Sequence, residues 1–382
     1  MRREIFTEEH ELYRESVRRF VAAEIVPNRE RWEAAGRVDR SLFEAAGAAG
    51  LLGIAAPEEH GGGGVDDFRF NAILSEELAE ADVLSAGLGL CLVADIAMPY
   101  FLHGITAEQQ ARWLPGIVAG TTIPALAMSE PGAGSDVASI ATTAVRDGDH
   151  YVVNGAKTFI TNGLNADLVI TAVKTDPSAG RKGISLLMID ANTPGFSRGR
   201  KLPKLGQHAA DTAELFFDDV RVPVEDLLGE ENRGFYTMMS HLAAERLSVA
   251  VQATAQASRA FDITLAYAKE RVAFGAPIGT FQHNRFALAE MRTEVDLGRA
   301  FVDRCLMAHV SGELSAVEAA EAKWWTTEMC QRVLDRGLQM HGGYGYMTEY
   351  PIARAWVDSR IQTIYAGTTE VMKEIVGRSL GL

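Results

Sequence analysis

Residues 127–136 read Ala-Met-Ser-Glu-Pro-Gly-Ala-Gly-Ser-Asp, and the character of the sequence changes at this stretch. Pro131 prevents a helix here, while Gly132 and Gly134 let backbone N–H groups come close to a bound ligand. Upstream, apolar residues recur at helical spacing, and downstream, short β-rich runs alternate with turns. We therefore expect a loop that opens a β unit and offers hydroxyl and N–H groups to a ligand.

Residues 1–121 are predicted to form an N-terminal all-helical domain. Thr7 begins a helix whose apolar residues repeat three and four positions apart. Thr106, with Gln109 three residues later, forms a capping-box pattern that marks another helix start. Four consecutive glycines, Gly61–Gly64, indicate a flexible loop.

Residues 122–229 are predicted to form a central β-domain. Four β-rich runs are separated by turn pairs such as Asn154-Gly155, and no helical pattern alternates with them. An antiparallel sheet or barrel is therefore favoured over a doubly wound parallel sheet. The runs are Tyr151–Val153, Leu168–Val173, Ile184–Ile189 and Ala213–Val220.

Residues 230–382 are predicted to form a C-terminal helical bundle, because four long helical patterns follow one another there. These patterns cover Gly234–Arg271, Phe281–Val310, Ser315–Leu338 and Thr368–Ser379. The expected fold class is α+β, with an N-terminal helical domain, a central antiparallel β-domain and a C-terminal four-helix bundle.

The amino-acid composition excludes some classes of binding partner and of cellular location. The 382 residues include 37 basic and 51 acidic side chains, a formal net charge of −14, which argues against nucleic acid or an anionic membrane as the main partner. The most apolar run, Leu84–Ala94, stops at Asp95 and is shorter than the roughly 20 residues of a membrane helix. Cys91, Cys305 and Cys330 form no disulfide framework, and the acid-rich start fits no signal or transit peptide. We expect a cytoplasmic protein with no membrane insertion.

Four more segments carry residues suited to ligand binding, although each one alone is also an ordinary structural element. Residues 159–161 (FIT) are an alternating strand end, and residues 271–278 (RVAFGAPI) begin with an arginine at a helix end, which suits phosphate. Residues 339–346 (QMHGGYGY) include His341, which has no second ligand at metal spacing, so no metal site is expected. Residues 365–370 (YAGTTE) contain natural caps for a last helix, whose N-terminus favours anions.

Together these segments resemble the acyl-CoA dehydrogenase family over nearly the whole chain. The loop at 128–136 and the segments 271–278, 339–346 and 365–370 match four family motifs in order and spacing. Residues 211–217 (DTAELFF) and 347–352 (MTEYPI) are most similar to the long-chain enzymes of the family. The resemblance implies the three-part fold described above, FAD, a homotetramer built as a dimer of dimers, and electron-transfer flavoprotein as the electron acceptor.

The resemblance also implies site residues, position by position. The flavin would contact the loop, the strand end and the start of the last helix, and its adenine-pyrophosphate end would be held by the other two motifs, with Arg271 and Gln282 reaching from a neighbouring subunit. The family often has Trp where Phe159 stands and Thr where Ser129 stands, and both changes keep the chemical type. The implied cofactor residues are Leu126, Ala127, Met128, Ser129, Gly132, Gly134, Ser135, Phe159, Ile160, Thr161, Arg271, Phe274, Gln282, Gln339, Met340, His341, Gly342, Gly343, Thr368, Thr369 and Glu370, and the implied substrate residues are Ser135, Tyr236, Ala243, Ala244, Arg246, Ala366 and Gly367.

The desaturation of an acyl thioester needs a carboxylate base beside the α-carbon, with a pKa raised by burial. Many family members place it just before the Gly-Thr pair of the last motif, where this chain has Ala366. Long-chain and isovaleryl-type members carry it in an earlier Glu-Arg pair, which Glu245-Arg246 matches. Met238 and Val249 share a helix face with Glu245, so the carboxyl is expected to emerge from an apolar stripe. The alternative is a solvated helix residue.

The sequence thus predicts FAD-dependent α,β-desaturation of a medium- or long-chain acyl-CoA, as in fatty acid β-oxidation, with the α-proton going to Glu245 and the β-hydride to flavin N5. The backbone N–H of Ala366 would be half of the oxyanion site. One alternative is a short branched acyl group such as isovaleryl. Another is an inert flavin- or acyl-CoA-binding subunit, which the missing glutamate at position 366 suggests and the presence of Glu245 opposes. An oxidase is disfavoured by the chain length.

Overall fold

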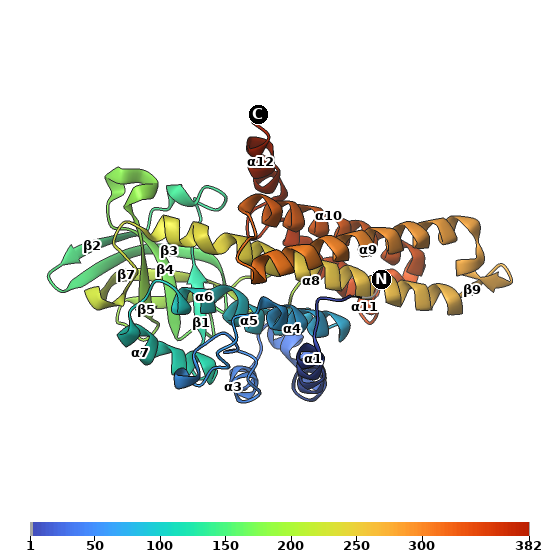
Figure 1. The fold of residues 1–382 in the computed structure, drawn as a ribbon, viewed down its shortest axis with the longest axis horizontal. Coiled ribbons are helices and arrows are strands. Elements are labelled where there is room, and N and C mark those ends of the chain that lie inside the picture. The colour runs from blue at the N-terminus through green and yellow to red at the C-terminus, as the bar shows by residue number, and fades with distance from the viewer. Residues whose placement is uncertain (1–2, 382) are drawn as a thin grey trace.

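The computed structural model describes residues 3–381 and begins with a layer of helices. Thr106 caps one of them as predicted, because its hydroxyl accepts from Gln109 N at 3.2 Å while the Gln109 side chain accepts from Thr106 N at 2.9 Å. The helices are α1 (Glu8–Phe20), α2 (Arg29–Ala35), α3 (Ser41–Ala48), α4 (Phe68–Glu80), α5 (Leu84–Cys91), α6 (Met98–Leu102) and α7 (Ala107–Val118). Figure 1 shows this layer below the sheet and the long helices.

The helical stretch Leu84–Leu102 corrects one expectation. By length and composition it could cross a membrane, with a mean hydropathy of 1.6, although 72% of it is buried inside the protein, as in a core helix. The helix continues past Asp95 because that carboxyl is satisfied inside the protein. It accepts hydrogen bonds from Ser248 Oγ and, at 3.0 Å, from Asn71 Nδ2. A charged residue that has buried partners does not end an apolar helix.

The central strands form one mixed sheet in the order β6-β7-β3-β2-β4-β5-β8, with β1 beside β4. Most pairings are antiparallel, as expected, but β1 runs parallel to β4 and β2 meets β4 in one parallel pair. The strands are β1 (Pro124–Ala127), β2 (Thr143–Asp147), β3 (His150–Thr161), β4 (Leu168–Lys174), β5 (Ile184–Asp190), β6 (Phe196–Lys201), β7 (Thr212–Pro223) and β8 (Leu227–Leu228).

The two central strands β4 and β5 are buried on both faces. Ile170 and Met188 pack into the core shared with the N-terminal helices, whereas Val169 and Leu187 pack into a second core with β3 and β7. This double burial explains why their sequences are continuous apolar runs. The arrangement leaves the end of β1, and the loop that follows it, at the border between the sheet and the helices.

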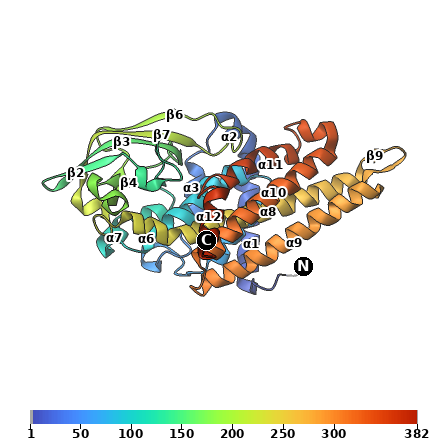
Figure 2. The ribbon, with the colours of Figure 1, turned by 90° about the horizontal axis from the view of Figure 1, so that it is seen from above.

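The C-terminal helices lie beside the sheet (Figure 2). Helices α8 (Gly234–Glu270), α9 (Gln282–Val310) and α10 (Ala316–His341) pack along one another, and α11 (Pro351–Ser359) packs against α8 and α10 as a fourth. The sequence patterns did not indicate α11. The last expected helix, α12 (Thr369–Ser379), packs against α10 and projects from the body of the molecule (Figure 1). At the opposite end of α8, the short strands β9 (Val272–Ala273) and β10 (Ala276–Pro277) form a hairpin that points away from the sheet (Figure 1).

Candidate active site

Glu245 is the buried carboxyl that the helical pattern predicts. It lies in the first half of α8 and is 4% exposed, and its neighbours on the same helix face, Met238 and Val249, are also buried. Burial raises the pKa of Glu245 to about 7, while a hydrogen bond from Tyr100 and the charge of Arg246 act in the opposite direction. A carboxyl with this pKa can accept a proton near neutral pH, as a general base must.

Tyr100 on α6 is the direct partner of this base. Its ring is fully buried, and its hydroxyl donates to Glu245 Oε1 at 3.2 Å. The ring packs on His241, one turn before Glu245, with centroids 4.4 Å apart. Burial lowers the pKa of His241 to about 4, so this imidazole is neutral at pH 7. Tyr100 is therefore held firmly enough to fix the direction of the carboxyl.

A turn at residues 366–368 meets α8 beside the base. Arg246, the residue after Glu245, donates from Nε to the Ala366 carbonyl at 3.5 Å, and Lys323 on α10 donates to the Gly367 carbonyl at 2.6 Å. Ala366 has a φ of +53°, a left-handed conformation unusual for a residue with a Cβ. Thr368 then caps α12 by accepting from Val371 N at 3.3 Å. The structure thus brings the Glu-Arg pair and the YAGTTE segment together.

The glycine-rich loop is anchored from behind by a buried ion pair. Lys157 on β3 donates to Glu130 Oε1 at 2.7 Å and to the Met128 carbonyl at 3.1 Å. Glu130 also accepts from the backbone N–H groups of Ala141 and Thr142. These bonds hold the loop while leaving its tip open, since a Cβ added at Gly132 or Gly134 would meet no atom within 4 Å.

Phe159 shows a local distortion that presents an aromatic ring. Its φ is +61° and its side chain is 70% exposed, at the point where the pairing of β3 with β7 slips between Lys157 and Ile160. Ile160 faces the sheet core, and so does Ala127, so only their main chains are available to a ligand. Leu126, Met128, Ser129 and Thr161 are half-buried, and Ser135 is exposed.

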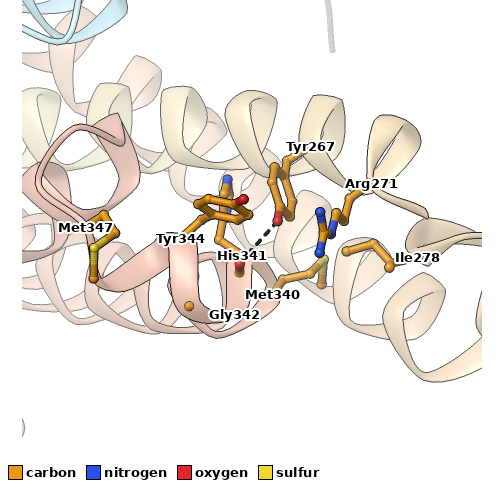
Figure 3. A pocket seen from close by; sticks show the side chains of 9 residues that line it. Tyr267, Arg271, Ile278, Met340, His341, Gly342, Tyr344 and Met347 are labelled. Carbon is orange, nitrogen blue, oxygen red and sulfur yellow. Dashed lines mark hydrogen bonds between the residues drawn. The ribbon is translucent and has the colours of Figure 1, made fainter. Parts of the chain in front are cut away.

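The other predicted cofactor residues surround a separate pocket at the far end of the bundle. Arg271, Met340, His341, Gly342 and Gly343 line it, together with Tyr267, Ile278, Tyr344 and Met347, and its volume is about 540 Å³. Figure 3 shows the Arg271 side chain and the ring of Tyr344 at this pocket. His341 is fixed by stacking on Tyr267, with centroids 4.2 Å apart, and by a 2.7 Å contact from Nδ1 to the Gly337 carbonyl.

Within one chain the two groups of predicted cofactor residues do not meet. The pocket lies toward the C-terminal end of α8, beside the β9–β10 hairpin, whereas Phe159 belongs to the sheet at the other end (Figure 1). Phe274 in that hairpin is fully exposed, and Gln282 and Gln339 are exposed too.

The predicted substrate residues differ in their exposure. Ala243, Ala244, Ala366 and Gly367 are half-buried, and Tyr236 at the start of α8 is 37% exposed, with the Arg233 guanidinium 4.6 Å from its ring centroid. No cluster of three metal-ligating side chains occurs among residues 3–381.

Sequence reasoning missed the residues that support this site. Tyr100 and Lys323 lie 145 and 44 positions from the groups they contact, so no local pattern joins the partners. One signal was available for Lys323, because its flanking residues Ala322, Trp324 and Trp325 are small or apolar, although Glu321 lies two positions before it. A charge there requires a buried partner.

The three parts of the chain match three family models. Residues 7–121 match the acyl-CoA dehydrogenase N-terminal domain, 125–220 the middle domain and 232–381 the C-terminal domain. The chain is 46% identical to the mitochondrial long-chain specific acyl-CoA dehydrogenase of Rattus norvegicus over 380 residues, covering 99% of this chain and 88% of the relative. It is 35% identical to the mitochondrial isovaleryl-CoA dehydrogenase of Oryza sativa over 378 residues, covering 98% and 92%.

Solved structures agree with these matches. The crystal structure of acyl-CoA dehydrogenase from Geobacillus kaustophilus is 49% identical and superposes with a TM-score of 0.97, covering 99% of this chain and 100% of that one. Fold and site thus define an oxidoreductase built from helical, β and helical units. The chain belongs to the acyl-CoA dehydrogenase family.

Members of this family are FAD enzymes, and a matching glutaryl-CoA dehydrogenase structure from Mycobacterium smegmatis holds FADH2. The residues of this chain fit such a cofactor. An exposed aromatic ring and an open glycine-rich loop lie at the sheet border, and Thr369 Oγ1 is buried with no hydrogen-bond partner among the described residues. Arg271, in the pocket at the far end of the bundle, forms no ion pair with the described carboxylates.

Proposed function

We propose that this protein desaturates long-chain acyl-CoA thioesters between the α- and β-carbons, with Glu245 as the base. The observation that carries the proposal is the buried carboxyl of Glu245, which has a pKa of about 7 and lies beside a turn that offers no acid of its own at Ala366. FAD, when bound, accepts the β-hydrogen as a hydride. Glu245 Oε2 or Oε1 takes the α-hydrogen as a proton, so that the pair of electrons left on the α-carbon completes the double bond.

The chain's own groups prepare this step. Tyr100 directs the carboxylate, and the surrounding apolar residues exclude water, which would otherwise lower the basicity of Glu245. Backbone N–H groups of the 366–368 turn are suited to hold the thioester oxygen as its negative charge grows. Residues 339–343 and Arg271 would hold the adenine-pyrophosphate part of FAD, and Phe159 with residues 126–135 would hold its ring system.

The preference for a long acyl chain rests on two observations. The identity to a long-chain specific enzyme is 46%, against 35% to an isovaleryl-CoA dehydrogenase. Ala366 also replaces a glutamate side chain with a methyl group beside the thioester position, and Ala243 and Ala244 are small. A short branched acyl group uses the same base position and is therefore the alternative.

An anaerobic titration separates the two. We expect hexadecanoyl-CoA to bleach the flavin absorbance stoichiometrically and faster than isovaleryl-CoA at equal concentration. Faster bleaching by isovaleryl-CoA would support the alternative. No bleaching by either ligand, in a protein that contains stoichiometric FAD, would overturn the proposal and favour an inert binding subunit.

We also propose a homotetramer in which FAD spans two subunits, with electron-transfer flavoprotein as the acceptor. The support is the separation, within one chain, of Phe159 from the pocket that contains Arg271. The Arg271→Ala variant is expected to lose FAD, and mixing it with Phe159→Ala should restore FAD at some sites if subunits exchange and each site takes one group from each chain. Native mass spectrometry of the mixture measures this, and a monomer that retains FAD would contradict the arrangement.

A further inference from the structure

Two buried cations lie beneath the turn that precedes α12. Lys323 is 0% exposed and Arg246 is 6% exposed, and they come from different helices of the bundle. Each donates to one main-chain carbonyl of the turn, Lys323 to Gly367 and Arg246 to Ala366. Neither is within ion-pair distance of a carboxylate among residues 3–381. Removing two such charges from water is costly, and a carboxylate would be the usual compensation.

The turn itself has an unusual backbone. Ala366 and Gly367 have consecutive positive φ angles of +53° and +95°. Gly367 tolerates this conformation, whereas Ala366 is strained by its Cβ. Strained backbone of this kind persists only where surrounding contacts hold it in place. The two cations supply those contacts, since they bind the main-chain carbonyls of Ala366 and Gly367 themselves.

The hydrogen bonds to these two carbonyls also set the direction of the backbone N–H groups in the turn. The peptide bonds here are trans, so the N–H of each peptide points opposite to its carbonyl. With the carbonyls of Ala366 and Gly367 turned inward to Arg246 and Lys323, the N–H groups of Gly367 and Thr368 are turned away from the bundle interior. The turn therefore presents a row of donors on its outer side, backed by two positive charges.

We propose that Lys323 is a positioning residue for the desaturation step. It holds the 366–368 turn so that the N–H groups of Gly367 and Thr368 meet the thioester oxygen, and its charge favours the enolate-like state. This inference rests on the function proposed above. Lys323 does not touch the substrate; it acts through the Gly367 carbonyl and through its field.

The electrostatic surroundings of Lys323 agree with such a role. Burial and, to a smaller extent, the charge of Arg246 lower the pKa of Lys323 to about 7, whereas Glu370 at the start of α12 acts in the opposite direction. Negative charge developing on the thioester would favour the protonated ammonium in the same way as Glu370 does. The protonated Lys323 is therefore expected to stabilise the negative charge on the thioester, and that negative charge is expected to stabilise the protonated form of Lys323.

The test uses the holoenzyme and the variants Lys323→Met, which removes the donor and the charge, and Lys323→Gln, which keeps a donor without charge. Thr326→Val is the matched control, because Thr326 is buried on the same helix and bonds only to carbonyls of its own helix. Two quantities are measured, namely kcat and KM with hexadecanoyl-CoA, and the pH at which bound 3-oxododecanoyl-CoA becomes an enolate. That ligand has an acidic α-carbon but no β-hydrogen, so it reports enolate stabilisation without turnover, through long-wavelength absorbance against the oxidised flavin.

For Lys323→Met we expect kcat to fall about tenfold with KM within about twofold, because the variant disturbs the backbone N–H donors of the 366–368 turn without removing either of them. The midpoint of enolate formation should rise by about one pH unit, which is the same tenfold factor. Lys323→Gln should lie between Lys323→Met and the native enzyme, and Thr326→Val should match the native enzyme. An unchanged midpoint, or a raised KM with unchanged kcat, overturns the proposal. If Lys323→Met does not fold, the midpoint of Lys323→Gln decides alone. A native enzyme that forms no enolate and is not reduced by hexadecanoyl-CoA refutes the proposed function instead.

Discussion

Replacing Glu245 by Gln is expected to stabilise the folded protein at alkaline pH while strongly slowing flavin reduction. The ordinary pKa of a glutamate is 4.5, and burial raises that of Glu245 to about 7. At about 1.4 kcal/mol for each pKa unit, this gap corresponds to about 3 kcal/mol of unfolding free energy. Glutamine has the same shape, stays neutral, and can still accept the hydrogen bond of Tyr100.

The sign of the effect depends on which state is ionised. Below pH 4.5 the carboxyl is protonated in the folded and the unfolded chain and contributes no difference. Between pH 4.5 and 7 the unfolded chain loses this proton while the folded chain keeps it, so the native enzyme loses stability as pH rises. Above pH 7 the full cost of the buried charge is present. The stability advantage of Glu245→Gln therefore grows from near zero at pH 4.5 to about 3 kcal/mol above pH 7.

Thermal unfolding of both proteins at pH 5 and pH 8 measures this difference, with flavin content matched. Glu77→Gln is the control, because Glu77 is equally buried but accepts from Arg14 and Arg18, so its loss should destabilise the protein at both pH values. An anaerobic mixture with acyl-CoA should show reduction slowed by at least about 10²-fold in Glu245→Gln. If this variant is no more stable than the native protein at pH 8, Glu245 does not carry a buried charge and the assignment of the base is wrong.

Two further predictions concern the supports of the site. Tyr100→Phe removes a hydrogen-bond donor to the ionised form of Glu245, so the pKa of Glu245 should rise and the acidic limb of the kcat/KM profile should move up by about one pH unit. The control Tyr13→Phe loses a buried hydroxyl that has no hydrogen-bond partner among the described residues, and it should leave the pH profile in place. Equal pH profiles for the two variants would contradict the role of Tyr100. Glu130→Gln leaves Lys157 buried without its carboxylate and should destabilise the holoenzyme by roughly 3–5 kcal/mol. On heating, this variant should release its flavin at a lower temperature than the native enzyme. An unchanged release temperature would contradict the prediction.

The sequence predicted those features of the site that depend on local spacing. The helical repeat placed Met238 and Val249 with Glu245, and burial of that face follows directly from the repeat. The Thr106–Gln109 capping pair predicted a helix start because its hydrogen bonds join residues three positions apart. The glycine-rich loop was predicted from Pro131 and the glycines beside it.

Features that depend on distant partners could not be predicted in this way. The parallel pairing of β1 with β4 joins segments about 40 residues apart. The glycine run Gly61–Gly64 was expected to be flexible, yet Gly62 N bonds the Pro57 carbonyl and Gly64 N bonds the Ala56 carbonyl. A Cβ at Gly62 would lie 2.1 Å from the Ala56 carbonyl oxygen, so this glycine serves close packing. Composition alone does not distinguish a packed glycine from a mobile one.

Helix α8 contributes both the base and a residue that binds the 366–368 turn, because neighbouring side chains on a helix point about 100° apart. Glu245 meets Tyr100 from the N-terminal helices, and Arg246 meets the 366–368 turn. Before the reaction, the costly negative charge is on the enclosed carboxyl, whose raised pKa expresses that cost. Proton transfer neutralises Glu245 and moves the negative charge to the thioester, toward the side where the positively charged Arg246 and Lys323 bind main-chain carbonyls. The same burial that destabilises the ionised base thus favours the transfer, and the two cations lower the energy of its product.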